Sequence, residues 1–422
     1  MADNVIYYGP PGTGKTYFIQ SLQAKYIDYN ITDQQIKDAY MRRSADWLLI
    51  TLIILQNHGK MSPADIQVKI TALVLHTTIN VSSVLETHNI ASPMSGVVSR
   101  ETPRIFFEPS HGLWYVDRNR LLLYDAHFID NYLSMCDVEQ RYDFVTFHQS
   151  FSYEDFIEGI RPTYEQATNT IDYSPKPGIF KQLCEKAHQN PEKSYAIFID
   201  EINRGNVSEI FGELITLIEL DKREGQPYAL SAVLPYSKET FSVPNNLSII
   251  GTMNAADRSI AAIDIALRRR FRFEPILPDT GVIERELELA GVDARDIDGV
   301  DLIALFDTIN ARIELLLDNN HLIGHSYFLK VRSGNDIADV IRYHIVPLLE
   351  EYFYDDLRKI QLIFNDLDAD GAQRSHAIYC CDTLSVDQLF EFVGEYLLED
   401  KRRYFVNEYI SVDSLKQIYI GN

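Results

Sequence analysis

The sequence predicts an α/β protein with a parallel sheet, an inserted helical domain and a helical C-terminal part. Three observations lead to this prediction. A short apolar run at Val5–Tyr8 stops at a glycine-rich loop that leads into a helix. Four further runs typical of strands appear only after residue 142, and one of them, Tyr195–Ile199, is apolar throughout, as expected for a buried parallel strand. The stretch between them is helical in pattern, and the pattern becomes helical again from about Pro278. Among the later helices, the sequence predicts Ile179–Gln189, Val207–Asp221, Pro347–Asn365 and Ser385–Leu398.

The loop after the first strand has the spacing Gly-x-x-x-x-Gly-Lys-Thr of a phosphate-binding loop. Its glycines let successive N–H groups point at phosphate oxygens, and the following helix adds its positive end. Lys15 is expected to reach the β- and γ-phosphates, and the Thr16 hydroxyl to bind Mg²⁺. The residues expected to bind a nucleoside triphosphate are Gly9, Pro10, Pro11, Gly12, Thr13, Gly14, Lys15 and Thr16.

The composition fits a folded protein of two or three domains. The chain has 422 residues, 46% of them hydrophobic, and a formal net charge of −22. It contains no membrane-length apolar run, no signal-peptide pattern and no C-x-x-C pair among four cysteines. We therefore expect a cytoplasmic protein without structural zinc, disulfides or a membrane partner. The negative charge argues against extensive nucleic-acid contact but allows a local basic patch or DNA binding through a partner.

Residues 21–142 are expected to form an inserted domain that interrupts the nucleotide domain. Helices are predicted at Asp33–Arg43, at Asp46–Gln56 and from Pro63, with Ser62 as N-cap, and a hairpin at Arg104–Phe107 and Leu113–Val116. Three helices and a hairpin are the outline of a winged helix-turn-helix. Residues 31–130 carry nine Lys/Arg and ten Asp/Glu, and the nine include four arginines of the wing, Arg100, Arg104, Arg118 and Arg120. DNA contact is possible, although many winged helices bind proteins instead.

Polar side chains close two of the later strands. The apolar strand Tyr195–Ile199 ends in Asp200 and Glu201. Asp200 is expected to hold Mg²⁺, directly or through water, and Glu201 to orient and polarise the attacking water. Asn254 follows the strand at Leu247–Gly251 and should lie beside both carboxylates, because ligands of parallel sheets sit beyond the strands' carboxyl ends. There it could hydrogen-bond the γ-phosphate or the water, although an asparagine after a strand often only forms a turn.

Three consecutive arginines, Arg268, Arg269 and Arg270, stand at the end of a predicted helix at Ile260–Arg269. Helix C-termini favour cations, but capping does not need three of them. A guanidinium offered to the γ-phosphate of a neighbouring subunit contributes a factor of about 10³–10⁵ to hydrolysis. Such a finger implies a shared site and hence a head-to-tail ring. Spacing does not say which arginine is the finger.

Taken together, these motifs resemble the McrB-type AAA+ proteins. The matching stretches are Gly9–Thr16, Thr146–Phe156, Ile199–Asn206, Met253–Ser259, Ala266–Phe271, Ile323–Phe328 and Pro347–Phe353. The resemblance covers about residues 1–20 and 143–365 and implies an AAA+ P-loop NTPase with a five-stranded parallel sheet. The predicted domains are a nucleotide-binding core at 1–20 plus 143–277, the winged-helix-like insertion at 21–142, a helical lid at 278–370 and a C-terminal extension at 371–422.

Members of this family are GTP-hydrolysing motors of modification-dependent restriction systems. The resemblance therefore implies a hexameric ring that hydrolyses GTP with Mg²⁺ and drives a McrC-like nuclease subunit on DNA in anti-phage defence. It makes Asn254 the first sensor and places Asp257 and Arg258 in the inter-subunit or hydrolysis-control part of the nucleotide site. Asn203 and Arg204 extend the same edge. The preference for GTP over ATP comes from the resemblance alone.

The sequence also departs from the family pattern. Ala255 stands where members often carry threonine, and Gly324–Tyr327 stands where many AAA+ proteins have a sensor arginine. The sequence begins directly at the phosphate-loop strand, so target recognition is expected from the insertion, the tail or another protein. Two other interpretations stay open: a MoxR-like ATPase that remodels proteins, and a slow nucleotide-gated scaffold that presents the inserted domain.

Overall fold

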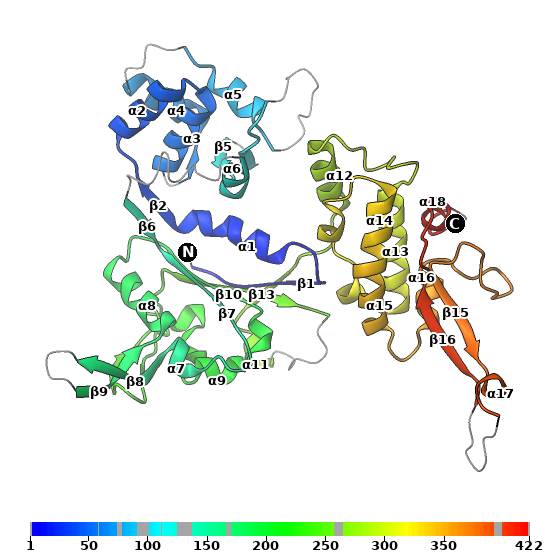
Figure 1. The fold of residues 1–422 in the computed structure, drawn as a ribbon. Coiled ribbons are helices and arrows are strands. Elements are labelled where there is room, and N and C mark those ends of the chain that lie inside the picture. Colours follow the sequence, from blue (N-terminus) through cyan, green and yellow to red (C-terminus); the bar gives the residue numbers. More distant parts are fainter. Residues whose placement is uncertain are drawn as a thin grey trace. The chain divides into compact units, whose positions relative to one another are not determined.

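A computed structural model describes residues 2–57, 59–73, 78–90, 101–110, 112–124, 137–165, 170–256, 265–391 and 399–420. The chain forms two compact units, shown in Figure 1. The first is built mainly of residues 16–252 and contains most of the nucleotide-binding sheet and the insertion. The second consists mainly of residues from Phe273 onward, together with the phosphate loop at Tyr7–Lys15.

Five strands form the central sheet, in the order β14-β1-β13-β10-β7. Their bounds are β1 Asn4–Gly9, β7 Tyr142–Thr146, β10 Tyr195–Asp200, β13 Leu247–Asn254 and β14 Arg272–Pro275. β10 pairs in parallel with both β7 and β13, and its residues Tyr195–Ile199 are at most 2% exposed. The predicted five-stranded parallel sheet is confirmed. Because Ile199 is in register with Gly251, the ends of β10 and β13 lie side by side.

Helices cover both sides of this sheet, with α1 (Lys15–Gln23) on one side and α8 (Ile179–Gln189) on the other, as Figure 1 shows. The predicted single helix at Val207–Asp221 is wrong. The chain instead forms α9 (Val207–Phe211) and α10 (Leu214–Leu217). Gly212 lies between them with a φ of +51°, a left-handed conformation that an α-helix cannot contain.

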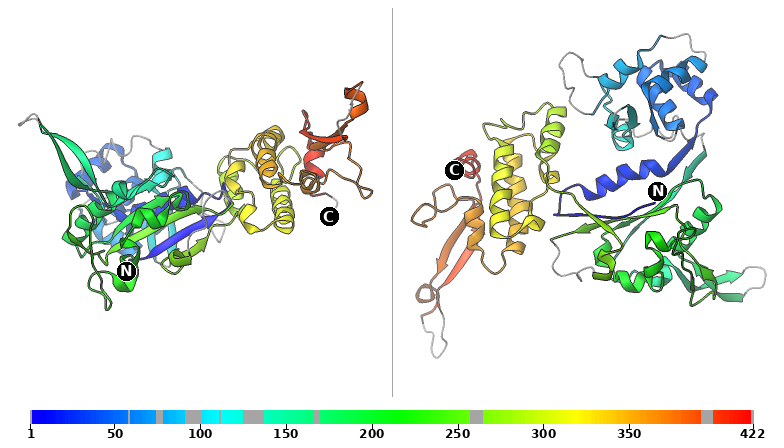
Figure 2. Two further views of the ribbon diagram at one scale, coloured as in Figure 1. Left: turned by 90° about the horizontal axis from the view of Figure 1, so that it is seen from below. Right: turned by 180° about the vertical axis from the view of Figure 1, so that it is seen from behind.

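Two hairpins extend from the first unit. β8 (Glu158–Glu165) and β9 (Thr170–Pro177) pair over eight residues, and Figure 2, left, shows this green hairpin reaching away from the sheet. One face of the ribbon is apolar, and Ile160, Tyr164, Ile171 and Tyr173 on it are each more than half exposed. The second hairpin is short and consists of β11 (Ala232–Val233) and β12 (Thr240–Phe241).

The insertion has its own hydrophobic core, drawn from residues between Ile27 and Leu121. Its elements are α2 Asp33–Arg43, α3 Asp46–Gln56, β3 Lys60–Met61, α4 Pro63–Ala72, α5 Val81–Thr87, β4 Phe106–Ser110, β5 Leu113–Val116 and α6 Arg118–Tyr124. Every residue of α3 from Trp47 to Leu55 is buried. Ser62 caps α4 as predicted, since its side chain accepts the N–H of Asp65. The pairing of β3 with β5 adds a third strand to the predicted hairpin.

The arginines predicted for the wing do not form an open basic surface. Arg118 lies over the ring of Tyr29, 4.9 Å from its centroid, and Arg120 pairs with Asp117 at 3.6 Å. Arg100 lies outside the described residues. Arg118 and Arg120 thus make contacts within the insertion, and a role of the wing arginines, Arg104 included, in DNA binding stays a prediction.

A two-stranded ribbon, here called the stem, connects the insertion to the rest of the first unit. β2 (Ile27–Asn30) enters the insertion and β6 (Asp137–Gln140) leaves it, and the two strands pair antiparallel. At the base of the stem the N–H of Arg141 donates to the carbonyl of Tyr26 at 2.8 Å. The Arg141 guanidinium also pairs with Asp28 at 2.8 Å, with both side chains less than a tenth exposed.

The second unit is a helical lid that shares one core with the C-terminal residues. Its main helices are α12 Thr280–Leu289, α13 Leu302–Leu316, α14 Gly334–Val340, α15 Val346–Tyr352 and α16 Arg358–Ile363. The predicted single helix at Pro347–Asn365 is wrong, because α15 ends at Tyr352 and α16 begins only at Arg358. A π-turn at Ile341–Ile345 joins α14 to α15, just before Pro347, which has no N–H to donate. The side chain of Asp356 accepts the N–H of Arg358 and starts a new helix.

The C-terminal extension packs on the lid rather than standing apart. β15 (Tyr379–Leu384) and β16 (Lys401–Val406) form a hairpin, and α18 (Val412–Lys416) follows. Buried Asp366 accepts the N–H groups of Ile378 and Tyr379, both at 2.8 Å. The predicted helix at Ser385–Leu398 is wrong, because α17 ends at Leu389 and Phe390 is extended. No helix among the described residues is long and apolar enough to cross a membrane.

Candidate active site

The phosphate loop has a backbone shape that only glycine adopts easily. Gly12 and Gly14 have φ values of +77° and +73°, in the left-handed region. The Thr13 hydroxyl donates to the Pro10 carbonyl at 3.0 Å and closes the turn. The Lys15 ammonium donates to the carbonyls of Gly9 and Pro10 at 3.0 and 2.7 Å. The loop is therefore already curled, and the Lys15 ammonium is held by carbonyl groups of the loop itself.

Two chain segments close tightly around the first glycine of the loop. A β-carbon on Gly9 would lie 2.1 Å from the Ile276 carbonyl oxygen, so no other residue fits there. The N–H of Ala255 donates to the Gly9 carbonyl at 3.0 Å. Asn254 precedes it, and its side-chain oxygen accepts the N–H of Ala256 at 3.3 Å. The structure thus brings Asn254 to the phosphate loop, in part as a turn-forming residue.

A second cluster lies where β10 and β13 end. The hydroxyl of Thr252 donates to the Asp200 carboxylate and accepts the N–H of Glu201 at 3.2 Å. Glu201 has a φ of +52°, which is rare for a non-glycine residue and typical of functional sites. Its carboxylate accepts from Arg204 Nε at 3.2 Å. Thr252 was missed from sequence, although its place at the end of a strand beside Asp200 was the available signal.

The three arginines occupy different environments. Arg270 is buried, with a side chain 4% exposed, and pairs with Glu219 at 3.0 Å. Its backbone carbonyl accepts from Asn4 at 3.1 Å. Arg268 is exposed at the end of α11 (Ile265–Arg268), and the Arg269 side chain is 69% exposed. Arg270 therefore has a structural role inside its own subunit. Arg269 also pairs with Glu219, at 3.6 Å, but it lies at the surface, as Arg268 does. Asp257 and Arg258 lie outside the described residues.

The predicted Mg²⁺ ligands are one hydroxyl, that of Thr16, and one carboxylate, that of Asp200. No group of three or more His, Cys, Asp or Glu residues in the described ranges could hold a metal by itself. Such a sparse set fits Mg²⁺, which keeps several waters and binds one or two protein groups together with substrate phosphates.

Comparison with known families finds matches for two parts of this chain. The family model described as "McrB, alpha-helical lid domain" matches residues 301–361, and the model "AAA domain (dynein-related subfamily)" matches residues 127–271. The "Type IV methyl-directed restriction enzyme EcoKMcrB subunit" of Escherichia coli (strain K12) is 42% identical over 244 residues, 55% of this chain and 51% of that protein. The chain thus contains an AAA domain followed by a McrB-type lid.

A second relative is more distant. The "Type II restriction enzyme BsuMI component YdiS" of Bacillus subtilis (strain 168) is 28% identical over 194 residues, 42% of this chain and 54% of that protein. The chain thus spans about half the length of the curated relatives that it matches. The AAA match holds Asp200, Glu201, Asn254 and the arginines, and begins at residue 127, so most of the insertion lies between it and the phosphate loop.

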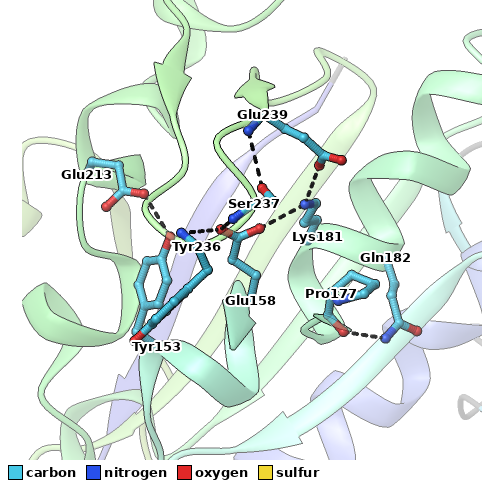
Figure 3. Close-up of polar contacts among 9 residues, drawn as sticks. All are labelled: Tyr153, Glu158, Pro177, Lys181, Gln182, Glu213, Tyr236, Ser237 and Glu239. Carbon is cyan, nitrogen blue, oxygen red and sulfur yellow. Dashed lines mark hydrogen bonds and ion pairs between the residues drawn. The ribbon is translucent and has the colours of Figure 1, made fainter. Parts of the chain in front are cut away.

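A buried ion pair fastens both hairpins of this protein to the first unit (Figure 3). Glu158 is fully buried at the start of β8 and accepts from the Lys181 ammonium at 2.9 Å. It also accepts the N–H groups of Tyr236 and Ser237, in the turn between β11 and β12, at 3.0 and 2.9 Å. Burial opposes ionisation, but the N–H donors of Ser237 and Tyr236 and the ammonium hold the pKa of Glu158 below its usual value.

We predict that Glu158→Ala lowers the free energy of unfolding by about 3–5 kcal/mol, because it leaves two N–H groups without an acceptor and the buried Lys181 with only the exposed Glu239 as its partner. Glu239→Ala is the matched control. Glu239 contacts the same ammonium at 2.6 Å, but its side chain is 64% exposed, so its loss should cost at most about 1 kcal/mol. Urea unfolding of both variants measures the difference. Equal losses would contradict the role given to the buried carboxylate.

Proposed function

We propose that this chain is a nucleoside triphosphate hydrolase that works as the ring-forming motor of a restriction system. The observation that supports this most is the pair Asp200–Glu201 at the end of β10, with the Thr252 hydroxyl bonded to both residues. A carboxylate for Mg²⁺ and a carboxylate for the attacking water are what phosphoryl transfer to water requires. The curled phosphate loop would bind the phosphates of the nucleotide.

Each residue then has a distinct task. Lys15 would neutralise charge on the β- and γ-phosphates, and Thr16 and Asp200 would hold Mg²⁺, which would offset further phosphate charge. Glu201 orients and polarises the attacking water, and its ion pair with Arg204 holds the carboxylate in position. Asn254 hydrogen-bonds the γ-phosphate or that water. Asp257 and Arg258 belong to the hydrolysis-control part of the site.

We further propose GTP rather than ATP as the substrate, a hexameric ring, and a McrC-like nuclease as partner on DNA. The names of the two relatives, a restriction enzyme subunit and a restriction enzyme component, support a defence function. The outward position of Arg268 and Arg269 supports a site completed by a neighbouring subunit. The net charge of −22 supports DNA contact mainly through the partner.

Turnover of GTP and ATP by the purified chain, with and without a candidate McrC-like nuclease, tests this function. We expect GTP hydrolysis that the partner stimulates, and no turnover by Lys15→Ala. Sedimentation with a slowly hydrolysed GTP analogue should show a hexamer. ATP turnover without GTP turnover would refute the choice of nucleotide, and a neighbouring gene for a protein-remodelling partner would favour the MoxR-like alternative.

A further inference from the structure

One loop of the lid is bonded directly to the phosphate loop. The N–H of Gly324 donates to the Pro11 carbonyl at 3.2 Å, and the N–H of Ser326 donates to the Gly12 carbonyl at 2.9 Å. The approach is so close that a β-carbon on Gly324 would lie 2.0 Å from the carbonyl carbon of Gly12. The residue between the two hydrogen bonds, His325, is therefore held against the phosphate loop.

The imidazole of His325 is only 7% exposed, and its surroundings fix the position of its proton. Nδ1 accepts the backbone N–H of Asp279 at 3.2 Å, so in the neutral ring the proton is on Nε2. Burial lowers the pKa of His325 below its ordinary value, with Asp279 opposing and Arg285 assisting this shift, so the ring is neutral near pH 7.

The Nε2–H group faces the phosphate loop. A β-carbon on Gly14 would lie 3.5 Å from Nε2, whereas the real glycine leaves that space open. Among the residues that the structure describes, no group accepts a hydrogen bond from this N–H. This N–H is therefore available to donate to the oxygen of a ligand bound at the phosphate loop.

We propose that His325 is a nucleotide-binding residue of the lid, whose Nε2–H donates to an oxygen of the nucleotide held by the phosphate loop. This inference rests on the proposed function, since it assumes that the loop binds a nucleotide. With this role, His325 gives the lid a neutral hydrogen-bond donor in the segment Gly324–Tyr327, where many AAA+ proteins have a sensor arginine. A neutral donor adds to binding in the ground state and in the transition state alike, so its removal should raise KM more than it lowers kcat.

The test measures dissociation constants of fluorescent mant-GTP and mant-ATP for the full chain and its variants. His325→Ala should weaken binding of at least one of them by about 10- to 100-fold, the loss of one hydrogen bond to a charged group. His325→Gln keeps an acceptor for Asp279 and a donor toward the loop, so it should remain within a few-fold of wild type. kcat at saturating nucleotide should change little in either variant.

His321→Gln is the matched control, because His321 is also a buried lid histidine, 5% exposed, and bonds Asp318 within the lid. It should leave nucleotide affinity unchanged. If His325→Ala does not fold, His325→Leu, which fills a similar volume without a donor, replaces it. Equal affinity of the donor-free variant and wild type, with binding abolished in Lys15→Ala, would overturn this inference alone. Full binding by Lys15→Ala would instead overturn the proposed function.

Discussion

Glu201→Gln is expected to lower nucleotide turnover by about 10²- to 10⁴-fold, the usual contribution of a general base. The amide keeps the size of the side chain and its bond to Arg204 but can no longer polarise the attacking water. Nucleotide binding should persist, because the phosphate loop is unchanged. Single-turnover hydrolysis and mant-GTP binding, measured on the same preparation, separate the two steps.

Glu209→Gln is the control for this experiment. Glu209 is an exposed glutamate on α9 with no role in the proposed site, so the same chemical change there should leave turnover at the wild-type level. Turnover by Glu201→Gln within about threefold of wild type would exclude Glu201 as the base. A slow nucleotide-gated scaffold would then become the better description of the protein.

We expect one of the two variants Arg268→Ala and Arg269→Ala to keep normal turnover. The other should lose nucleotide turnover by up to about 10³- to 10⁵-fold, because it lacks the arginine finger. Arg270→Ala should act differently. Its removal leaves Glu219 without its buried partner, so we expect a loss of stability of about 3 kcal/mol instead of a specific loss of turnover. Urea unfolding and turnover, measured on all three variants, distinguish a finger from a structural arginine.

Mixing variants tests whether the site is shared. The inactive arginine variant has an intact Glu201, and Glu201→Gln has intact arginines, so a mixed ring contains some sites with both groups. Turnover of the mixture should exceed that of either variant alone. A mixture as inactive as its components would argue for an arginine that acts within its own subunit, and normal turnover by both Arg268→Ala and Arg269→Ala would remove the finger from this helix.

The sequence predicted elements well where local chemistry decides them. α2, α3 and α8 have the predicted bounds, and Ser62 caps α4, because caps and apolar periodicity act within a few residues. The end of β10 was equally readable, because a fully apolar run predicts a buried strand and the two acidic residues after it mark where that strand must end. Both signals depend only on residues close in the sequence, and the structure agrees with the predictions made from them.

Features that depend on distant residues were not predictable in the same way. Gly212 breaks a helix that amphipathic spacing favoured, since nothing in the spacing reveals a positive φ. Thr252 shows no motif, and its role comes from the pairing of β10 with β13. Arg269 and Arg270 both pair with Glu219, and they differ because the fold buries the side chain of Arg270 and leaves that of Arg269 exposed. Each of these facts needs the tertiary fold.

The stem bears on how such a protein can acquire new targets. The bond between Tyr26 and Arg141 means that the chain leaves the nucleotide domain and returns to it at nearly one point. About 110 residues could therefore be exchanged for another folded domain without moving any strand of the central sheet. The inserted domain can thus be replaced in evolution, while the nucleotide-binding sheet and its site stay the same.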